Sequence, residues 1–395
     1  MNFPPFSVKT SLLVTSLLVT NGCFSTLVFA KSENNLDINV AAEAGYIDNF
    51  LYQANDEQST AFYTVSSVLA LESKSNQSAF NVDATVDAFI FQDFEDDDHT
   101  DFSLMPTYQF KFSQNQRLYM SAYWLNNYNY RGSGLSLGEA ESLVEGDKKE
   151  NNGAQIGFEY GNLDSLSRLS FEANYQQGEF TTRRAITREL DTEAIDLKSS
   201  FDYLISGKTY MAIDVSYRQV DYPNQPALNR DSLTGLVGVK WQTTVISELS
   251  FLVGYQNIKF ENATLKDDDA FKWRFDYTWR PSDFTSVRLA SDRKFDETDR
   301  LASTYRLAET YQVDISHAFT DHISLTALIG LNREEFITPD NQREEDYLNS
   351  VLKLNYQRND RLSFHLQYRY KSLDANYADI DYGYNNISMG VKVRL

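Results

Sequence analysis

Basic residues recur on the polar side of alternating segments in the second half of the chain, and acidic residues do so in the first half. The basic set is Lys272, Arg274, Arg280, Arg288, Arg306, Lys353 and Arg369. The acidic set is Glu43, Asp83 and Asp87. If both sets line one water-filled passage, a wall of Lys and Arg favours anions, and opposed charged walls create a field across the passage. The alternative is that these charges pair across neighbouring strands and hold the wall rigid.

Aromatic rings also occupy some positions on the polar side of the alternating segments. In such a passage they would stack on the apolar faces of sugar rings; the alternative is that they fill the interior or contact a plug. These residues are Phe89, Phe91, Tyr119, Tyr123 and Tyr210.

Residue patterns for enzymatic or metal chemistry are weak. The chain has four His and no G-x-S-x-G or H-E-x-x-H motif. His317 shares the apolar side of its segment with Ile315. If that side faces a membrane, we expect His317 to lie at the boundary between lipid and water, and the alternative is a Ser/His/acid hydrolase whose active site faces lipid. The acidic runs at 93–99 and 267–269 suit hard divalent cations, but they lack an EF-hand glycine turn, and we expect solvated loops. We therefore predict no enzyme, no cofactor and no metal, and the net charge of −20 argues against nucleic acid.

The segment Phe271–Arg293 predicts the kind of element that positions these side chains. From Phe271 to Trp279 every second residue is aromatic, and the residues between them are polar or charged. This period of two is typical of a strand with one apolar and one polar face. The sequence Pro281-Ser282-Asp283 breaks the pattern as a tight turn does, and alternation resumes at Val287. We predict a β-hairpin with a strongly aromatic face.

Similar alternating segments fill nearly all of the chain, about 18 of them (16–18). Short connections such as Arg280–Phe284 alternate with long ones such as Arg131–Asn151 and Arg333–Asp346. Aromatic residues make up 14% of the chain, yet no segment is long and apolar enough for a membrane-spanning helix. The prediction is an all-β protein: a single closed antiparallel transmembrane β-barrel with short periplasmic turns and long extracellular loops.

The two ends of the sequence fit a barrel of a Gram-negative outer membrane. Residues 1–30 resemble a secretory signal peptide, and a lipoprotein signal with lipidated Cys23 is the alternative. Residues 31–395 then form the barrel. The last segment is the predicted insertion strand, which must pair with the first strand near Ile38 so that no edge is left open in lipid. Its marker residues are Tyr384, Ile387, Met389, Val391, Val393 and Leu395.

The opening hairpin also carries a family resemblance. The run Trp279-Arg280-Pro281-Ser282, followed by Ser286-Val287-Arg288-Leu289 and Arg293, resembles the putative β-barrel porin 2 family. Barrels of that family are often associated with exopolysaccharide biosynthesis and export. The resemblance implies an outer-membrane barrel tied to extracellular polysaccharide and supplies no functional residue.

The expected function is a channel for polysaccharide export or for other polar solutes. The alternative is a non-conducting barrel that scaffolds a secretion assembly or surface matrix. The expected partners are outer-membrane lipid and lipopolysaccharide, the barrel-insertion machinery, and a polysaccharide with its export complex.

Overall fold

The computed structural model describes residues 33–395 apart from 163, 242–245, 301–302, 339–341 and 378–379. The predicted signal peptide, including Cys23, lies outside the described residues. Among the described residues, no helix is long and apolar enough to cross a membrane.

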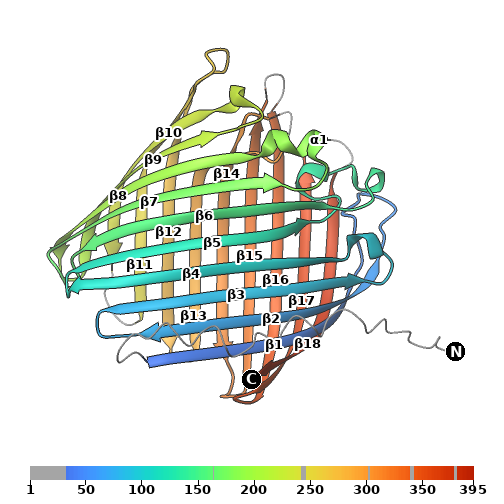
Figure 1. The fold of residues 1–395 in the computed structure, drawn as a ribbon, viewed down its shortest axis with the longest axis horizontal. Coiled ribbons are helices and arrows are strands. Elements are labelled where there is room, and N and C mark those ends of the chain that lie inside the picture. Colours follow the sequence, from blue (N-terminus) through green and yellow to red (C-terminus); the bar gives the residue numbers. More distant parts are fainter. Residues whose placement is uncertain (1–32, 163, 242–245, 301–302, 339–341, 378–379) are drawn as a thin grey trace, which may run out of the picture.

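Eighteen strands form one antiparallel sheet that closes on itself (Figure 1). Each strand pairs with its neighbours along the chain, and β18 pairs with β1 from Asn39↔Arg394 to Ile47↔Asn386. The predicted all-β closed antiparallel barrel of about 18 strands is therefore confirmed. The strands are β1 (Glu33–Ile47), β2 (Thr60–Lys74), β3 (Ser78–Phe91), β4 (His99–Ser113), β5 (Gln116–Asn129), β6 (Asp147–Tyr160), β7 (Ser167–Phe180), β8 (Thr192–Ser206), β9 (Thr209–Asp221), β10 (Arg230–Trp241), β11 (Ser247–Phe260), β12 (Asp268–Ser282), β13 (Thr285–Asp296), β14 (Tyr305–Ala318), β15 (Ile323–Ile337), β16 (Gln342–Asn359), β17 (Leu362–Ala375) and β18 (Tyr382–Arg394).

The period-two pattern assigns each strand an outer and an inner face. On β12 the aromatic side chains of Phe271 and Trp279 are exposed on the outside, whereas Lys272 between them is buried. On β18 the side chains of Ile387 and Met389 are exposed, whereas Ser388 between them is buried. The exposed apolar face is the one that lipid would cover, and the opposite face lines the lumen.

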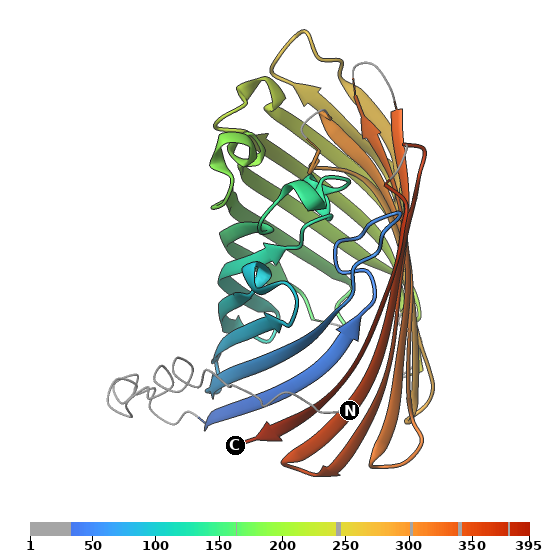
Figure 2. The ribbon, with the colours of Figure 1, turned by 90° about the vertical axis from the view of Figure 1, so that its right-hand side faces the viewer.

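The connections at the two ends of the barrel differ in length. At one end, two residues join β8 to β9, β12 to β13 and β16 to β17. At the other end residues 48–59, 92–98, 130–146, 181–191 and 297–304 form longer connections. The end of β18 lies at the short-turn end, where the Leu395 amide donates to the Ile38 carbonyl (2.9 Å; Figure 2).

One predicted long loop is mostly strand. We expected Arg333–Asp346 to be a loop, but β15 continues to Ile337, β16 starts at Gln342, and Arg333 pairs with Asp346 in the ladder. Their side chains form an exposed ion pair (2.9 Å). A strand that extends beyond lipid into water becomes polar on both faces, so its hydrophobic alternation ends before its backbone pairing does.

Several long connections contain short helices. The 3₁₀ helices are η1 (Glu95–Asp97), η2 (Gly134–Ser136), η3 (Ala140–Ser142), η4 (Arg188–Leu190) and η5 (Pro226–Leu228), and the one α-helix among the described residues is α1 (Arg184–Thr187). Figure 2 shows the blue and teal connections, which follow β1, β3 and β5, between the two walls of the barrel. These connections therefore fold over the mouth of the lumen.

Candidate functional site

The inner wall carries most of the predicted basic set, and neighbouring strands supply acids for three of its seven members. Arg288 on β13 contacts Asp276 on β12 and Asp314 on β14 (3.7 Å to Asp314). Arg306 on β14 contacts Glu334 on β15 (3.0 Å) and Asp296 on β13 (3.7 Å). In both cases the cation bridges strands on either side, which is the bracing arrangement that the sequence left as the alternative.

Arg274 makes a longer connection along the wall. Its guanidinium on β12 reaches Asp214 on β9 (2.9 Å). The buried side chains of Leu236 and Leu252, from the two strands between, form an apolar cluster with Ala212. The ion pair therefore links β9 to β12 across an apolar patch on the inner face of β10 and β11. The period-two pattern predicted polar residues on this face.

The other four basic residues differ in position. Arg280 contacts Glu248 at the short-turn end (3.3 Å), where both side chains are exposed. Lys272 is buried and donates to the Gln256 side-chain oxygen (3.2 Å). Lys353 faces the lumen between Thr326 and Gln367. Neither Lys353 nor Arg369 has a carboxylate within ion-pair distance among the described residues.

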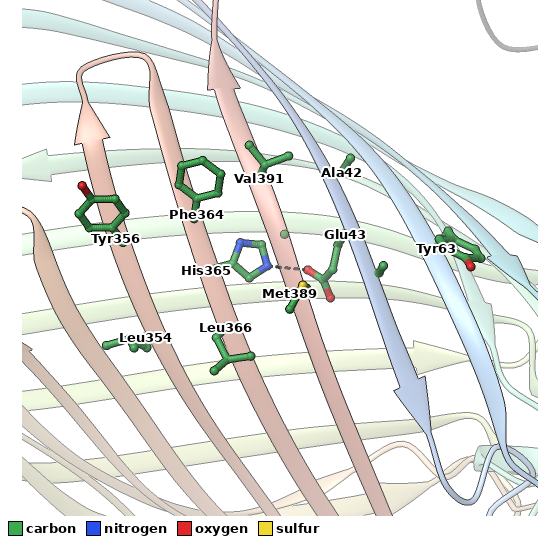
Figure 3. A pocket seen from close by; sticks show the side chains of 12 residues that line it. Ala42, Glu43, Tyr63, Leu354, Tyr356, Phe364, His365, Leu366, Met389 and Val391 are labelled. Atoms are coloured by element: carbon green, nitrogen blue, oxygen red, sulfur yellow. Dashed lines mark hydrogen bonds and ion pairs between the residues drawn. The ribbon is translucent and has the colours of Figure 1, made fainter.

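The acidic residue Glu43 belongs to a clasp at the seam where β18 meets β1. Gly390 on β18 lies in register between His365 on β17 and Glu43 on β1. The imidazole crosses over the glycine, and His365 Nε2 lies 2.8 Å from a Glu43 carboxylate oxygen (Figure 3). A Cβ at Gly390 would lie 2.5 Å from His365 Cε1, so the glycine is required for this close approach. Of the other two predicted acids, Asp83 is exposed and Asp87 is half-buried.

A second ring lies over a glycine farther along the wall. Tyr119, Gly157 and Glu172 align across β5, β6 and β7. The Tyr119 ring covers the glycine position, and its hydroxyl donates to Glu172 (2.9 Å). Sequence alone identified Tyr119 as a lumen aromatic. The glycine beneath it is visible only once the strand register is known.

A buried ion pair anchors the connections at the mouth. Asp97 in η1 is fully buried, and its carboxylate accepts hydrogen bonds from Arg131 Nε (2.9 Å) and from the Tyr128 hydroxyl (2.6 Å). The expectation that the whole run 93–99 is solvated is thus wrong for Asp97 and His99, which are both buried. The partners of Asp97 come from another hairpin. Among the described residues, no group of three or more His, Cys, Asp or Glu side chains has the geometry of a metal site.

Arg300 connects opposite sides of the mouth. It lies in the connection between β13 and β14, and its Nη1 donates to the Gly134 carbonyl in connection 130–146. Its Nη2 donates to Glu345 on β16 (2.9 Å). Arg300 and Glu345 are both buried. Burial alone would lower the pKa of Arg300, but the carboxylates of Asp299 and Glu345 outweigh it and raise that pKa. A permanent cation therefore fastens connection 130–146 across the barrel.

Arg218 makes another link to the same connection 297–304. This residue of β9 contacts Asp196 on β8 (2.6 Å) and Glu297 (3.0 Å). Because Glu297 follows β13, the contact joins two parts of the wall through the lumen. Neither Arg218 nor Arg300 was identified from the sequence, because their partners are distant along the chain.

An aromatic cluster joins connection 48–59 to the inner wall of the barrel. Phe50 stacks on Phe94 (ring centroids 4.5 Å apart), and Tyr52 stacks on Tyr384 (5.1 Å). Phe89 and Phe91, predicted as lumen aromatics, pack in or against this cluster. Burial raises the pKa of Tyr52 to about 12, so its hydroxyl stays protonated. Tyr384 of the predicted insertion strand thus faces inward, whereas the other five marker residues lie on the opposite parity.

His317 lies at the end of β14 near the short turns. Its Nδ1 is 2.9 Å from the Thr285 hydroxyl, and its ring meets Phe319 edge-on. These contacts pack the His317 ring between side chains of β13 and of the turn that follows β14.

Comparison with known proteins identifies one family. The family model described as putative beta-barrel porin 2 matches residues 37–395. No curated protein matches the sequence.

Solved structures resemble the barrel only distantly. OccK9 (OpdG) of Pseudomonas aeruginosa is 12% identical over 91% of this chain and 99% of its own, with a TM-score of 0.49. OccK5 (OpdH) of the same organism is 11% identical over 91% and 98%, with a TM-score of 0.47. The ferric-catecholate import receptor Fiu of E. coli K12 is 10% identical over 92% and 82%, with a TM-score of 0.47. These likenesses carry no functional conclusion.

Proposed function

The chain belongs to the putative beta-barrel porin 2 family, and on that basis we propose that its barrel is an outer-membrane channel for extracellular polysaccharide or other polar solutes. The observation that carries the proposal is the charged inner face of a closed 18-stranded wall. A barrel of this strand number encloses more space than its own side chains fill. Family membership favours a channel over an enzyme.

The same structure supports one alternative, a non-conducting barrel that scaffolds a secretion assembly. The observation in its favour is that Arg300 fastens connection 130–146 across the mouth. If this connection closes the passage completely, the ion-paired wall is structural. If it only narrows the passage, it selects solutes by size.

Conductance of the purified protein in planar bilayers tests the two functions. We expect discrete channels, and we expect deletion of residues 133–143 to raise the conductance because it removes the crossing segment. The matched control is Arg333→Gln, since its exposed ion pair lies on β15 and β16, outside that segment. If the wild-type protein and the 133–143 deletion both fold but neither conducts, the barrel is a scaffold and not a channel.

The remaining parts of the proposal concern location and partners. We propose export through a cleaved signal peptide at residues 1–30, assembly by the barrel-insertion machinery, and contact with lipid and lipopolysaccharide. Association with a polysaccharide export complex would distinguish this channel from a general porin. Cross-linking in cells between connection 130–146 and newly made surface polysaccharide tests that association.

A further inference from the structure

We propose that the lumen contains a binding site for a sugar ring that carries a carboxylate, in a cavity between β17 and connection 48–59. The inference rests on the proposed channel, because the cavity opens from the lumen. It adds a defined ligand class and a defined place of binding.

The cavity has a volume of about 300 Å³, at the lower end of the range of small-ligand pockets. Aromatic side chains of Phe89, Tyr130 and Tyr384 form part of its lining. Connection 48–59 contributes Phe50 and Tyr52 to the same lining. Flat rings of this kind pack against the C–H face of a pyranose ring, so the cavity suits one sugar unit of a chain.

Two cations of β17 provide a place for the carboxylate. Arg369 and Lys371 project into the cavity from the same face of the strand. No described carboxylate lies within ion-pair distance of either cation. Lys371 instead lies 3.4 Å from the Tyr52 hydroxyl and over the rings of Tyr52 (5.5 Å) and Tyr384 (5.3 Å). An anion placed here would relieve the repulsion between two like charges and gain charge-assisted hydrogen bonds.

Polar groups on the other side suit sugar hydroxyls. Asp87 on β3 lines the cavity, and its carboxylate would accept hydrogen bonds from hydroxyl groups. Glu43 also lines the cavity but is already bonded to His365. The oxygen of the buried Asn386 side chain has no hydrogen-bond partner in the described part of the structure. Among the described residues both cations lack a carboxylate partner, whereas Glu43 is already bonded to His365, and this difference favours an acidic sugar over an amino sugar.

The test is isothermal titration of the folded protein in detergent with three trisaccharides: one of glucuronate, one of glucose and one of glucosamine. Sodium acetate supplies the charge without the ring. We expect the glucuronate trisaccharide to bind most tightly and acetate weakly. Arg369→Gln and Lys371→Gln should each weaken its binding about tenfold. Arg361→Gln is the matched control, because this exposed arginine lies in a turn at the opposite end of the barrel.

Heat-modifiable gel migration checks the folding of each variant. If Arg369→Gln does not fold, Arg369→Lys keeps the charge, loses the guanidinium fork and should weaken binding to a smaller extent. Three results would each overturn the site. The acidic and neutral trisaccharides could bind equally well, or the glucosamine trisaccharide could bind more tightly than the glucuronate one. The folded Arg369→Gln and Lys371→Gln variants could both bind the glucuronate trisaccharide as tightly as the wild type. If the protein conducts but does not prefer the glucuronate trisaccharide, the proposed channel stands and the proposed sugar site is wrong. If the protein prefers the glucuronate trisaccharide but does not conduct, the proposed sugar site stands and the proposed channel is wrong.

Discussion

Arg300→Gln should release connection 130–146 from the opposite wall. The substitution removes the donor to the Gly134 carbonyl and one of the two cations that contact Glu345. Arg343 remains beside Glu345 (2.5 Å), so the buried carboxylate keeps a partner. The barrel should therefore fold, and the larger effect should fall on the loop.

The magnitude follows from the one hydrogen bond that the described residues show between Arg300 and that connection. A hydrogen bond from a charged donor contributes about 1.5–3 kcal/mol. A loss of about 2 kcal/mol raises the population of the released loop about 30-fold. The base of the connection stays in place, because Arg131 still pairs with the buried Asp97.

Limited proteolysis with a glutamate-specific protease measures this release, since Glu139 and Glu141 lie in the connection and cleavage requires a locally unfolded segment. We expect the cleavage rate of the Arg300→Gln protein to rise about 30-fold. We also expect its single-channel current to fluctuate more than that of the wild type. Arg333→Gln is the control, because an exposed pair contributes only about 0–1 kcal/mol. A folded Arg300→Gln protein that is cleaved as slowly as the wild type would show that Arg300 does not hold the loop.

Three further predictions concern the seam, closure and topology. Gly390→Ala should lower the free energy of unfolding in urea by about 1–3 kcal/mol, because the new Cβ displaces His365. Gly383→Ala on the same strand is the control and should have little effect, because no atom lies within 4 Å of its added Cβ. Equal effects of the two substitutions would show that Gly390 has no special role at the seam. Deletion of Tyr384–Leu395 should abolish heat-modifiable migration, because β1 would lose one of its two strand partners and the sheet could not close, and a truncated chain that still shows the migration would refute closure by β18. An epitope inserted between the exposed Glu141 and Ser142 should be labelled on intact cells, and labelling only after permeabilisation would invert the assigned topology.

The sequence predicted the architecture well because barrel strands carry their own signal. Alternation on β12 identified its outer face, and the alternating connection lengths identified the two ends. Boundaries beyond the membrane were less visible, as at Arg333 and Asp346, where pairing continues after the apolar pattern stops.

The site was predictable only in part. Placement of Arg274 and Arg288 on the lumen side follows from parity, and pairing of such charges across neighbouring strands was the stated alternative. The contacts of Arg300 were not predictable, because Gly134 lies 166 residues away and the pairing requires a folded loop. The clasp of His365, Gly390 and Glu43 becomes visible only after β18 is placed in register with β1.

The seam clasp also bears on the order of assembly. Glu43 and His365 are 322 residues apart, whereas every other pair of hydrogen-bonded strands is consecutive along the chain. The seam has nine register pairs, against fifteen between β1 and β2. Contacts that form only when the two ends of the sheet meet are absent from a transition state built of hairpins, so they change the unfolding rate more than the folding rate. We therefore expect the clasp to slow the unfolding of the closed barrel more than it speeds folding.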